Sequence, residues 1–195
     1  NLVHKKFHLS TRPSESQSLS LVAIGGYGRG EMAPYSDIDL LFLSNKRQTG
    51  WAKSVVESVL YLLWDLKFKV GHSSRTISDC VQLGLDDLTI RTSMLEKRYL
   101  CGSRDLFEEL ETTLKKKVFS KKASNFVEGK LSERAERHLK HANARYMLEP
   151  NIKEGKGGLR DLHTLYWISK YIYRTDNIQS LIEKKIFKRS ELEIF

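Results

Sequence analysis

One segment constrains the fold of this chain more than any other: a short apolar run ends at two glycines, and two aspartates open the next apolar run. Leu21 to Ile24 has the composition of a buried strand, and Gly25-Gly26 ends it with a tight turn. Asp37 and Asp39 then lead into the apolar residues 40–43. The pattern predicts two neighbouring buried strands of an α/β domain, with polar groups concentrated where one strand ends and the other begins.

The two aspartates predict a metal site. Side chains alternate along a strand, so Asp37 and Asp39 lie on the same face. Two like charges beside an apolar strand are costly unless a cation neutralises them. Mg²⁺ binds through one or two carboxylates together with substrate phosphates. We therefore predict that Asp37 and Asp39 bind Mg²⁺, with Mn²⁺ as the alternative ion.

The glycine-rich segment supplies groups for a phosphate. Without side chains, Gly25 and Gly26 leave their backbone N–H groups accessible, and a short helix starting near Gly28 would direct its positive end at the same place. Arg29 either adds charge or pairs with a neighbouring carboxylate, Glu31 or Asp37. Ser36 either contacts phosphate or caps the turn. The predicted nucleotide-binding residues are Gly25, Gly26, Gly28, Arg29 and Ser36.

Other interpretations of this segment compete with the metal-and-phosphate site. Each half alone fits an ordinary strand, turn and strand with a solvent-facing pair of aspartates, but both halves in this order favour the site. The chain contains no GxxxxGK followed by Ser or Thr. The dinucleotide fingerprint GxGxxG fails because Glu31 stands where its last glycine is required.

At this length the motif resembles a known family. A GG turn followed by DxD resembles the polymerase-β-like nucleotidyltransferase superfamily, and GGYGRGEMAPYSDIDLLFL resembles the protein-PII uridylyltransferase family. Residues 69–76, 87–102 and 151–163 carry the same likeness. The resemblance implies two-metal transfer of UMP from UTP to a tyrosine of the PII signal-transduction protein, with Asp37 and Asp39 as the catalytic residues and metal ligands.

The chain departs from the superfamily in one respect. Many members carry a third carboxylate on a neighbouring strand, often as the general base. The predicted strand 69–77 has Gly71, His72 and Ser73 instead, and His72 is more often structural than functional in such a position. The base is therefore left unassigned. Two alternatives stay open: a nucleotidyltransferase with another donor or acceptor, and a catalytically silent nucleotide-sensing module.

Hydrophobic periodicity predicts the remaining organisation. We expect a lead-in at 1–18, a nucleotidyltransferase domain at 19–118, and an incomplete all-helical domain at 119–195. The expected helices span residues 51–66, 79–100 (one or two, with a break near Gly84), 105–117, 123–147 and 159–173. In the helical domain, His138 and His141 are expected on a solvated face. Lys153, Lys156 and Arg160 either reach the nucleotide or pack between the domains.

Composition limits the classes of partner. The net charge of +9 fits an anionic partner, either nucleic acid or a nucleoside triphosphate, but it also fits a basic piece of a differently charged protein. The longest apolar stretch, residues 59–64, is far shorter than the roughly 20 residues of a membrane span. The two cysteines lack CxxC spacing and suit a reducing cytoplasm. We expect a cytoplasmic protein with neither nucleic acid nor membrane as partner.

The family resemblance also implies modules that this chain does not contain. Its members remove the uridylyl group with an HD hydrolase domain and sense glutamine through ACT domains. None of the six histidines here is followed by aspartate, as an HD site requires. We therefore expect these modules beyond residue 195.

Overall fold

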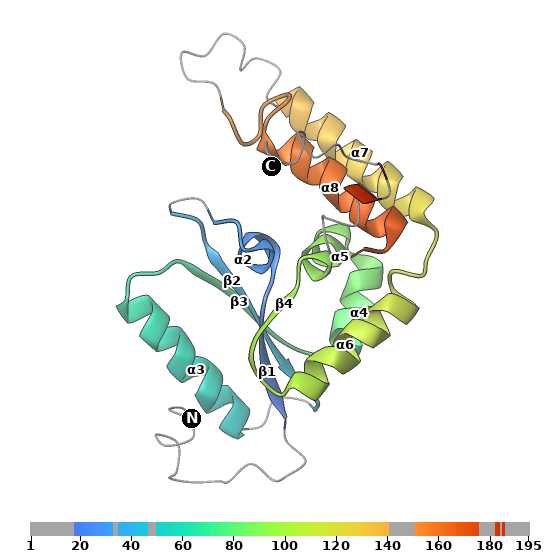
Figure 1. Cartoon of the computed structure of the whole chain (residues 1–195). Helices are drawn as coiled ribbons and strands as arrows, with labels where there is room; N and C mark the ends of the chain where they lie inside the picture. The colour runs from blue at the N-terminus through green and yellow to red at the C-terminus, as the bar shows by residue number, and fades with distance from the viewer. Residues whose placement is uncertain are drawn as a thin grey trace. The chain divides into compact units, whose positions relative to one another are not determined.

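The computed structural model describes residues 18–32, 35–46, 50–140, 151–175, 182, 183 and 185, and divides the chain into two units, residues 1–118 and 119–195. A mixed four-stranded sheet with the order β3-β2-β1-β4 lies at the centre of the first unit (Figure 1). Strand β2 is parallel to β3 and antiparallel to β1, which also pairs antiparallel with β4. The strands are β1 (Leu19–Ala23), β2 (Ile38–Ser44), β3 (Val70–Thr76) and β4 (Arg98–Gly102).

Helices cover both faces of this sheet. Leu40 and Phe42 of β2 pack on one face against Val56 and Leu60 of α3. The alternate residues of β2 point to the other face, where α4 and α6 lie (Figure 1). Burial on both faces explains why β2 is a continuous apolar run. The helices of this unit are α2 (Gly25–Arg29), α3 (Gly50–Asp65), α4 (Ile77–Asp86), α5 (Leu88–Leu95) and α6 (Arg104–Lys117).

The predicted α/β domain followed by helices is confirmed, but residues 79–100 differ from the prediction. They hold the larger part of α4, all of α5, and the start of β4. The break lies at Asp87, whose side chain accepts a hydrogen bond from the Ile90 N–H (2.8 Å) and begins α5. Gly84, the predicted break, is buried inside α4 against Val118.

The prediction of helix at Arg98–Leu100 is therefore wrong, because these residues form β4 with Cys101 and Gly102. This strand is short and only partly buried, so it carries little periodic signal. Its partner is β1, far away in the sequence, and local pattern cannot reveal such a pairing.

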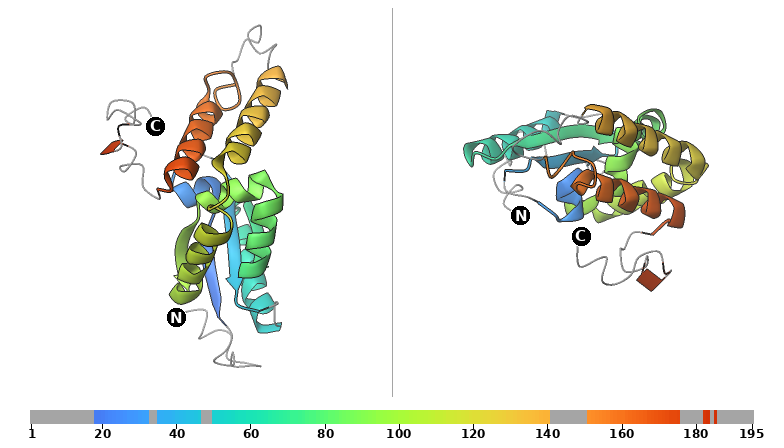
Figure 2. Two further views of the ribbon diagram at one scale, coloured as in Figure 1. Left: turned by 90° about the vertical axis from the view of Figure 1, so that its right-hand side faces the viewer. Right: turned by 90° about the horizontal axis from the view of Figure 1, so that it is seen from above.

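In the described part of the second unit, two helices lie side by side, α7 (Ala123–Lys140) and α8 (Leu159–Tyr173) (Figure 2). The ring of Phe126 stacks on that of Tyr171, with centroids 4.2 Å apart. The buried ammonium of Lys130 contacts Glu133 at 2.7 Å and lies 5.0 Å from the centre of the Trp167 ring. Residues 141–147 of the predicted helix 123–147, like residues 1–17 of the predicted lead-in, lie outside the described residues.

Candidate active site

Asp37 and Asp39 lie at the N-terminal end of β2, where the sheet meets the connection from α2. Asp37 is exposed, whereas Asp39 is partly buried. Burial, and then the negative charge of Asp37, raise the pKa of Asp39 above its ordinary value. The two carboxylates are therefore close enough to repel each other, as the i, i+2 spacing predicts. A cation between them would offset both this repulsion and the cost of burying the Asp39 charge.

The glycine turn, Gly25-Gly26, lies directly against Asp39. The Ile24 N–H donates to the Asp39 carbonyl (3.1 Å), which fastens the end of β1 to the start of β2. Gly25 has a φ of 59°, and a Cβ placed there would lie 3.0 Å from Oδ2 of Asp39. Gly25 therefore needs to be glycine both for its backbone conformation and for the close approach of this carboxylate.

Helix α2 begins earlier than the sequence predicted. It starts at Gly25 with Ile24 as its N-cap, not near Gly28. The two glycines therefore belong to the first turn of the helix itself. Ile24 still has the extended conformation of β1, and the helix begins at the next residue. A Cβ on Gly26 would have no neighbour closer than the Glu31 carbonyl oxygen at 3.7 Å, so this position has space beside it.

Gly28 and Arg29 face the protein interior. A Cβ on Gly28 would overlap the backbone carbonyl of Glu96, so Gly28 allows α2 to pack on the connection between α5 and β4. The Arg29 guanidinium contacts the buried Glu96 carboxylate at 2.5 Å and Glu31 at 3.3 Å. Of the roles open to Arg29 in the sequence, the structure shows pairing with Glu31. Nucleotide contact by Gly28 or Arg29 stays a prediction.

Arg98 completes the support of α2. Its guanidinium donates to the carbonyl of Tyr27 (2.6 Å) and to that of Gly28 (3.2 Å), so it satisfies backbone acceptors at the end of the helix. Neither Glu96 nor Arg98 was predicted from the sequence to support the site. Their only sequence signal is charge in a segment of mixed composition, which does not show that one of them is buried.

Ser36 and His72 lie differently with respect to the aspartates. Ser36 is exposed next to Asp37. His72 pairs in register with Leu40, so it belongs to the α3 face of the sheet and not to the face of Asp39. Its ring meets the edge of Trp64, with centroids 6.5 Å apart. This placement favours the structural interpretation of His72.

No group of three or more His, Cys, Asp or Glu side chains with metal-site spacing occurs among the described residues. Acidic residues near the site in sequence have other partners: Asp79 forms the capping box of α4, Asp87 caps α5 and Glu96 binds Arg29. The third carboxylate stays unassigned. Two carboxylates beside a turn of glycines fit an ion that takes its remaining ligands from phosphate and water.

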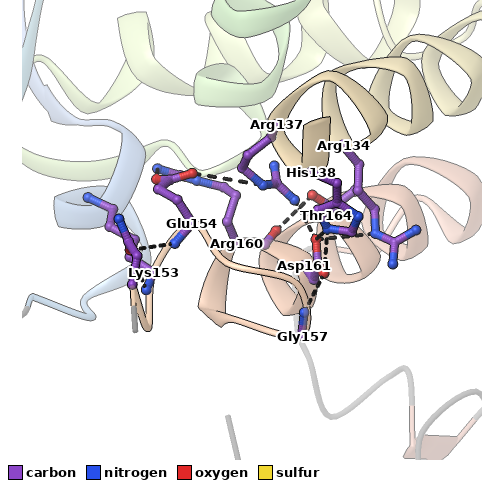
Figure 3. Close-up of polar contacts among 10 residues, drawn as sticks. Arg134, Arg137, His138, Lys153, Glu154, Gly157, Arg160, Asp161 and Thr164 are labelled. Atoms are coloured by element: carbon purple, nitrogen blue, oxygen red, sulfur yellow. Dashed lines mark hydrogen bonds and ion pairs between the residues drawn. The ribbon is translucent and has the colours of Figure 1, made fainter. Parts of the chain in front are cut away.

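The second unit contains a separate cluster of charged groups centred on Asp161 (Figure 3). Its carboxylate accepts hydrogen bonds from the Gly157 N–H (2.9 Å) and Arg134 (3.2 Å), and it contacts Arg137 and His138 on α7. Burial alone would raise the pKa of Asp161, but these donors outweigh it and lower the pKa to about 2. Asp161 thereby ties α8 to α7.

The prediction that His138 lies on a solvated face is wrong, because its side chain is only 13% exposed and contacts Asp161 at 2.9 Å. His141 lies outside the described residues. Arg160 is used within the second unit, where it pairs with Glu154 (3.5 Å) and lies over the Trp167 ring. Lys153 and Lys156 are exposed.

No described helix is long and apolar enough to cross a membrane. This finding concerns the described parts of the chain.

Comparison with known proteins gives two family matches. Residues 8–100 match the nucleotidyltransferase domain, which confirms the predicted class of the α/β domain. Residues 125–195 match GlnD PII-uridylyltransferase.

Two curated relatives match nearly the whole chain, and both are named bifunctional uridylyltransferase/uridylyl-removing enzyme. The protein of Cereibacter sphaeroides is 50% identical over 191 residues, which cover 98% of this chain and 20% of the relative. That of Ruegeria pomeroyi is 52% identical over 188 residues, 96% of this chain and 21% of the relative. The chain thus spans about a fifth of the length of these relatives. Given both family matches and this identity along nearly its whole length, the chain belongs to the family of bifunctional uridylyltransferase/uridylyl-removing enzymes.

Proposed function

We propose that this chain transfers UMP from UTP to a tyrosine hydroxyl of the PII nitrogen-regulatory protein in a reaction that depends on Mg²⁺. The observation that carries the proposal is the contact between the two halves of the site: Gly25 of the glycine turn lies against the Asp39 carboxylate. A triphosphate over the turn would therefore adjoin the aspartates. The names of the relatives supply the uridylyl group and the family match supplies PII.

In this reaction the tyrosine oxygen forms a bond to the α-phosphorus of UTP, the bond to pyrophosphate breaks, and the hydroxyl proton passes to water. Mg²⁺, when bound, would supply positive charge to the triphosphate and to the attacking oxygen. Asp37 and Asp39 would hold the ions, and the backbone N–H groups of Gly25 and Gly26 would orient the phosphates. Catalysis of this kind rests on positioning and charge neutralisation.

The cytoplasm is the proposed location. Cys80 is buried and Cys101 exposed, and both are free thiols, which suits a reducing compartment.

The test is incubation of the 195-residue chain with PII, α-labelled UTP and Mg²⁺ or Mn²⁺, with label on PII as the readout. We expect labelling that stops on addition of EDTA and that ATP, CTP and GTP do not support. Labelling from another nucleotide, or of another acceptor only, would replace the proposed donor or acceptor. Binding of UTP without transfer under all conditions would favour a nucleotide-sensing module.

A further inference from the structure

The Asp39 carboxylate lies between two glycines that come from different elements. Gly25, in α2, approaches Oδ2 as described above. On the other side, Gly71 of β3 is the register partner of Asp39 in the parallel pair β2–β3. A Cβ built on Gly71 would overlap Oδ1 of Asp39. The carboxylate thus occupies space that a side chain on β3 would otherwise fill.

Backbone conformation does not explain glycine at position 71. Gly71 is absent from the residues with positive φ, which include Gly25, Gly30, Gly102 and Gly157, so any residue could adopt its extended conformation. Glycine inside a strand weakens the strand, and it commonly marks a close approach of another group. Within the described structure, the only atoms other than chain neighbours within 4 Å of a Gly71 Cβ are the Asp39 Oδ1 and Cγ. The approaching group is therefore this one carboxylate.

We propose that Gly71 is a positioning residue. Because Gly71 has no side chain, the Asp39 carboxylate can lie beside it at the N-terminal end of β2, and a side chain at position 71 would displace this carboxylate. The proposal rests on the proposed function, in which Asp39 holds a metal ion. It also gives a physical reason for the departure from the superfamily pattern. A carboxylate at position 71 would start from a Cβ that overlaps Oδ1 of Asp39, so β3 could supply a third ligand at this register position only if the Asp39 carboxylate moved.

The first test is Gly71→Ala in the 195-residue chain, with Gly50→Ala as the matched control. Gly50 has no positive φ, and a Cβ there meets nothing within 4 Å. We expect Gly71→Ala to lower kcat roughly 100-fold, the size of effect that a misplacement of about 1 Å produces. At saturating Mg²⁺ the KM for UTP should change little, because no atom of the glycine turn lies within 4 Å of the new Cβ. Gly50→Ala should match the wild-type chain in both constants.

A second readout does not depend on turnover. Mn²⁺ binding is measured by electron paramagnetic resonance with a non-hydrolysable UTP analogue present. Gly71→Ala should bind Mn²⁺ at least about tenfold more weakly than the wild type, while adding it to Asp39→Asn should cause no further loss. Wild-type Mn²⁺ affinity in Gly71→Ala would overturn the proposal. Wild-type Mn²⁺ affinity in Asp39→Asn would instead refute the metal role of Asp39, and with it the proposed function.

A double-mutant cycle of stability tests the contact between position 71 and the Asp39 carboxyl without measuring activity. It stays informative if Gly71→Ala folds poorly. The melting temperatures of Gly71→Ala, Asp39→Ala and the double variant are compared with that of the wild type. Removing the Asp39 carboxyl removes both atoms that the new Cβ would meet. Gly71→Ala should therefore lower the melting temperature in the wild-type background and not in the Asp39→Ala background. An equal loss in both backgrounds would show that the strand itself requires glycine, and the proposal would fail.

Discussion

At the scale of single residues, Asp39 shows how a functional group is kept in a costly setting. Burial and the neighbouring charge of Asp37 both raise its pKa, so its ionised form is less favourable in the folded chain than in water. A carboxylate that served only the fold would gain partners that lower its pKa, as Asp161 does in the second unit.

We predict that Asp37→Asn and Asp39→Asn each reduce transfer of UMP by several orders of magnitude, because the amide keeps the shape and removes the charge that a cation requires. Neither should lower the melting temperature, since each substitution removes the repulsion between the two carboxylates that contributes to the raised pKa of Asp39. Asp65→Asn, at the exposed end of α3, is the control. Near-normal transfer by either variant would rule out the two-carboxylate mechanism.

A substitution at Gly26 tests nucleotide binding without disturbing the fold. A side chain at this position has ordinary space around it, with the nearest atom at 3.7 Å. Gly26→Val should therefore leave the fold intact while it obstructs the backbone N–H groups of the turn. We expect UTP affinity, measured by calorimetry, to fall at least about tenfold, or 1.4 kcal/mol. Gly50→Val serves as the control, and unchanged UTP affinity in Gly26→Val would show that phosphate does not lie over this turn.

At the scale of elements, the pair α7–α8 depends on one buried carboxylate. Asp161→Asn removes the charge that Arg134, Arg137 and His138 contact, and we expect the second unit to lose about 1–3 kcal/mol of unfolding free energy at pH 7. Because folding lowers the pKa of Asp161 to about 2, its contribution is complete above the unfolded pKa of about 3.9 and disappears as the pH falls from about 4 to about 2.

Denaturant unfolding across this pH range checks the prediction. The difference in unfolding free energy between wild type and Asp161→Asn should narrow as the pH falls toward 2. Glu136→Gln, at an exposed position of the partner helix α7, should behave as the wild type. A difference that is independent of pH would mean that the carboxylate charge is not what joins α7 to α8.

Elements with strong local patterns could be predicted from the sequence, and those that depend on distant partners could not. The apolar run of β2 and the helical spacing of α3 and α8 predicted these elements to within about two residues. The GG turn and the aspartates were found from residue type and order alone. Strand β4 was not predicted because its own residues show no regular alternation of apolar and polar side chains. Its pairing with β1, which is distant in the sequence, defines it as a strand. From the sequence, Gly71 was noted only as a position where other superfamily members could carry a third carboxylate. Its proposed role depends on the strand register that places it beside Asp39, which the sequence does not show.

At the scale of the whole molecule, the chain is far shorter than its relatives, whose names include a uridylyl-removing activity. We predict that the 195-residue chain does not release UMP from uridylylated PII and does not respond to glutamine, since no histidine in it is followed by aspartate. The measurement is UMP released with Mg²⁺ or Mn²⁺, with and without glutamine. A full-length relative is the positive control, and glutamine-stimulated release by the short chain would show that the removing activity resides in these residues.

The attachment of α2 to Glu96 and Arg98 has a consequence for the order in which the chain is made. Glu96 follows its partner Arg29 by 67 residues, and Arg98 follows Gly28 by 70. At about 5–20 residues per second, the glycine turn leaves the ribosome roughly 3–14 s before the residues that hold it. Until then α2 lacks these anchors, and β1 lacks its partner β4. We expect the nascent chain to acquire its affinity for a triphosphate only after β4 has paired with β1. An unfinished chain would then not bind nucleotide.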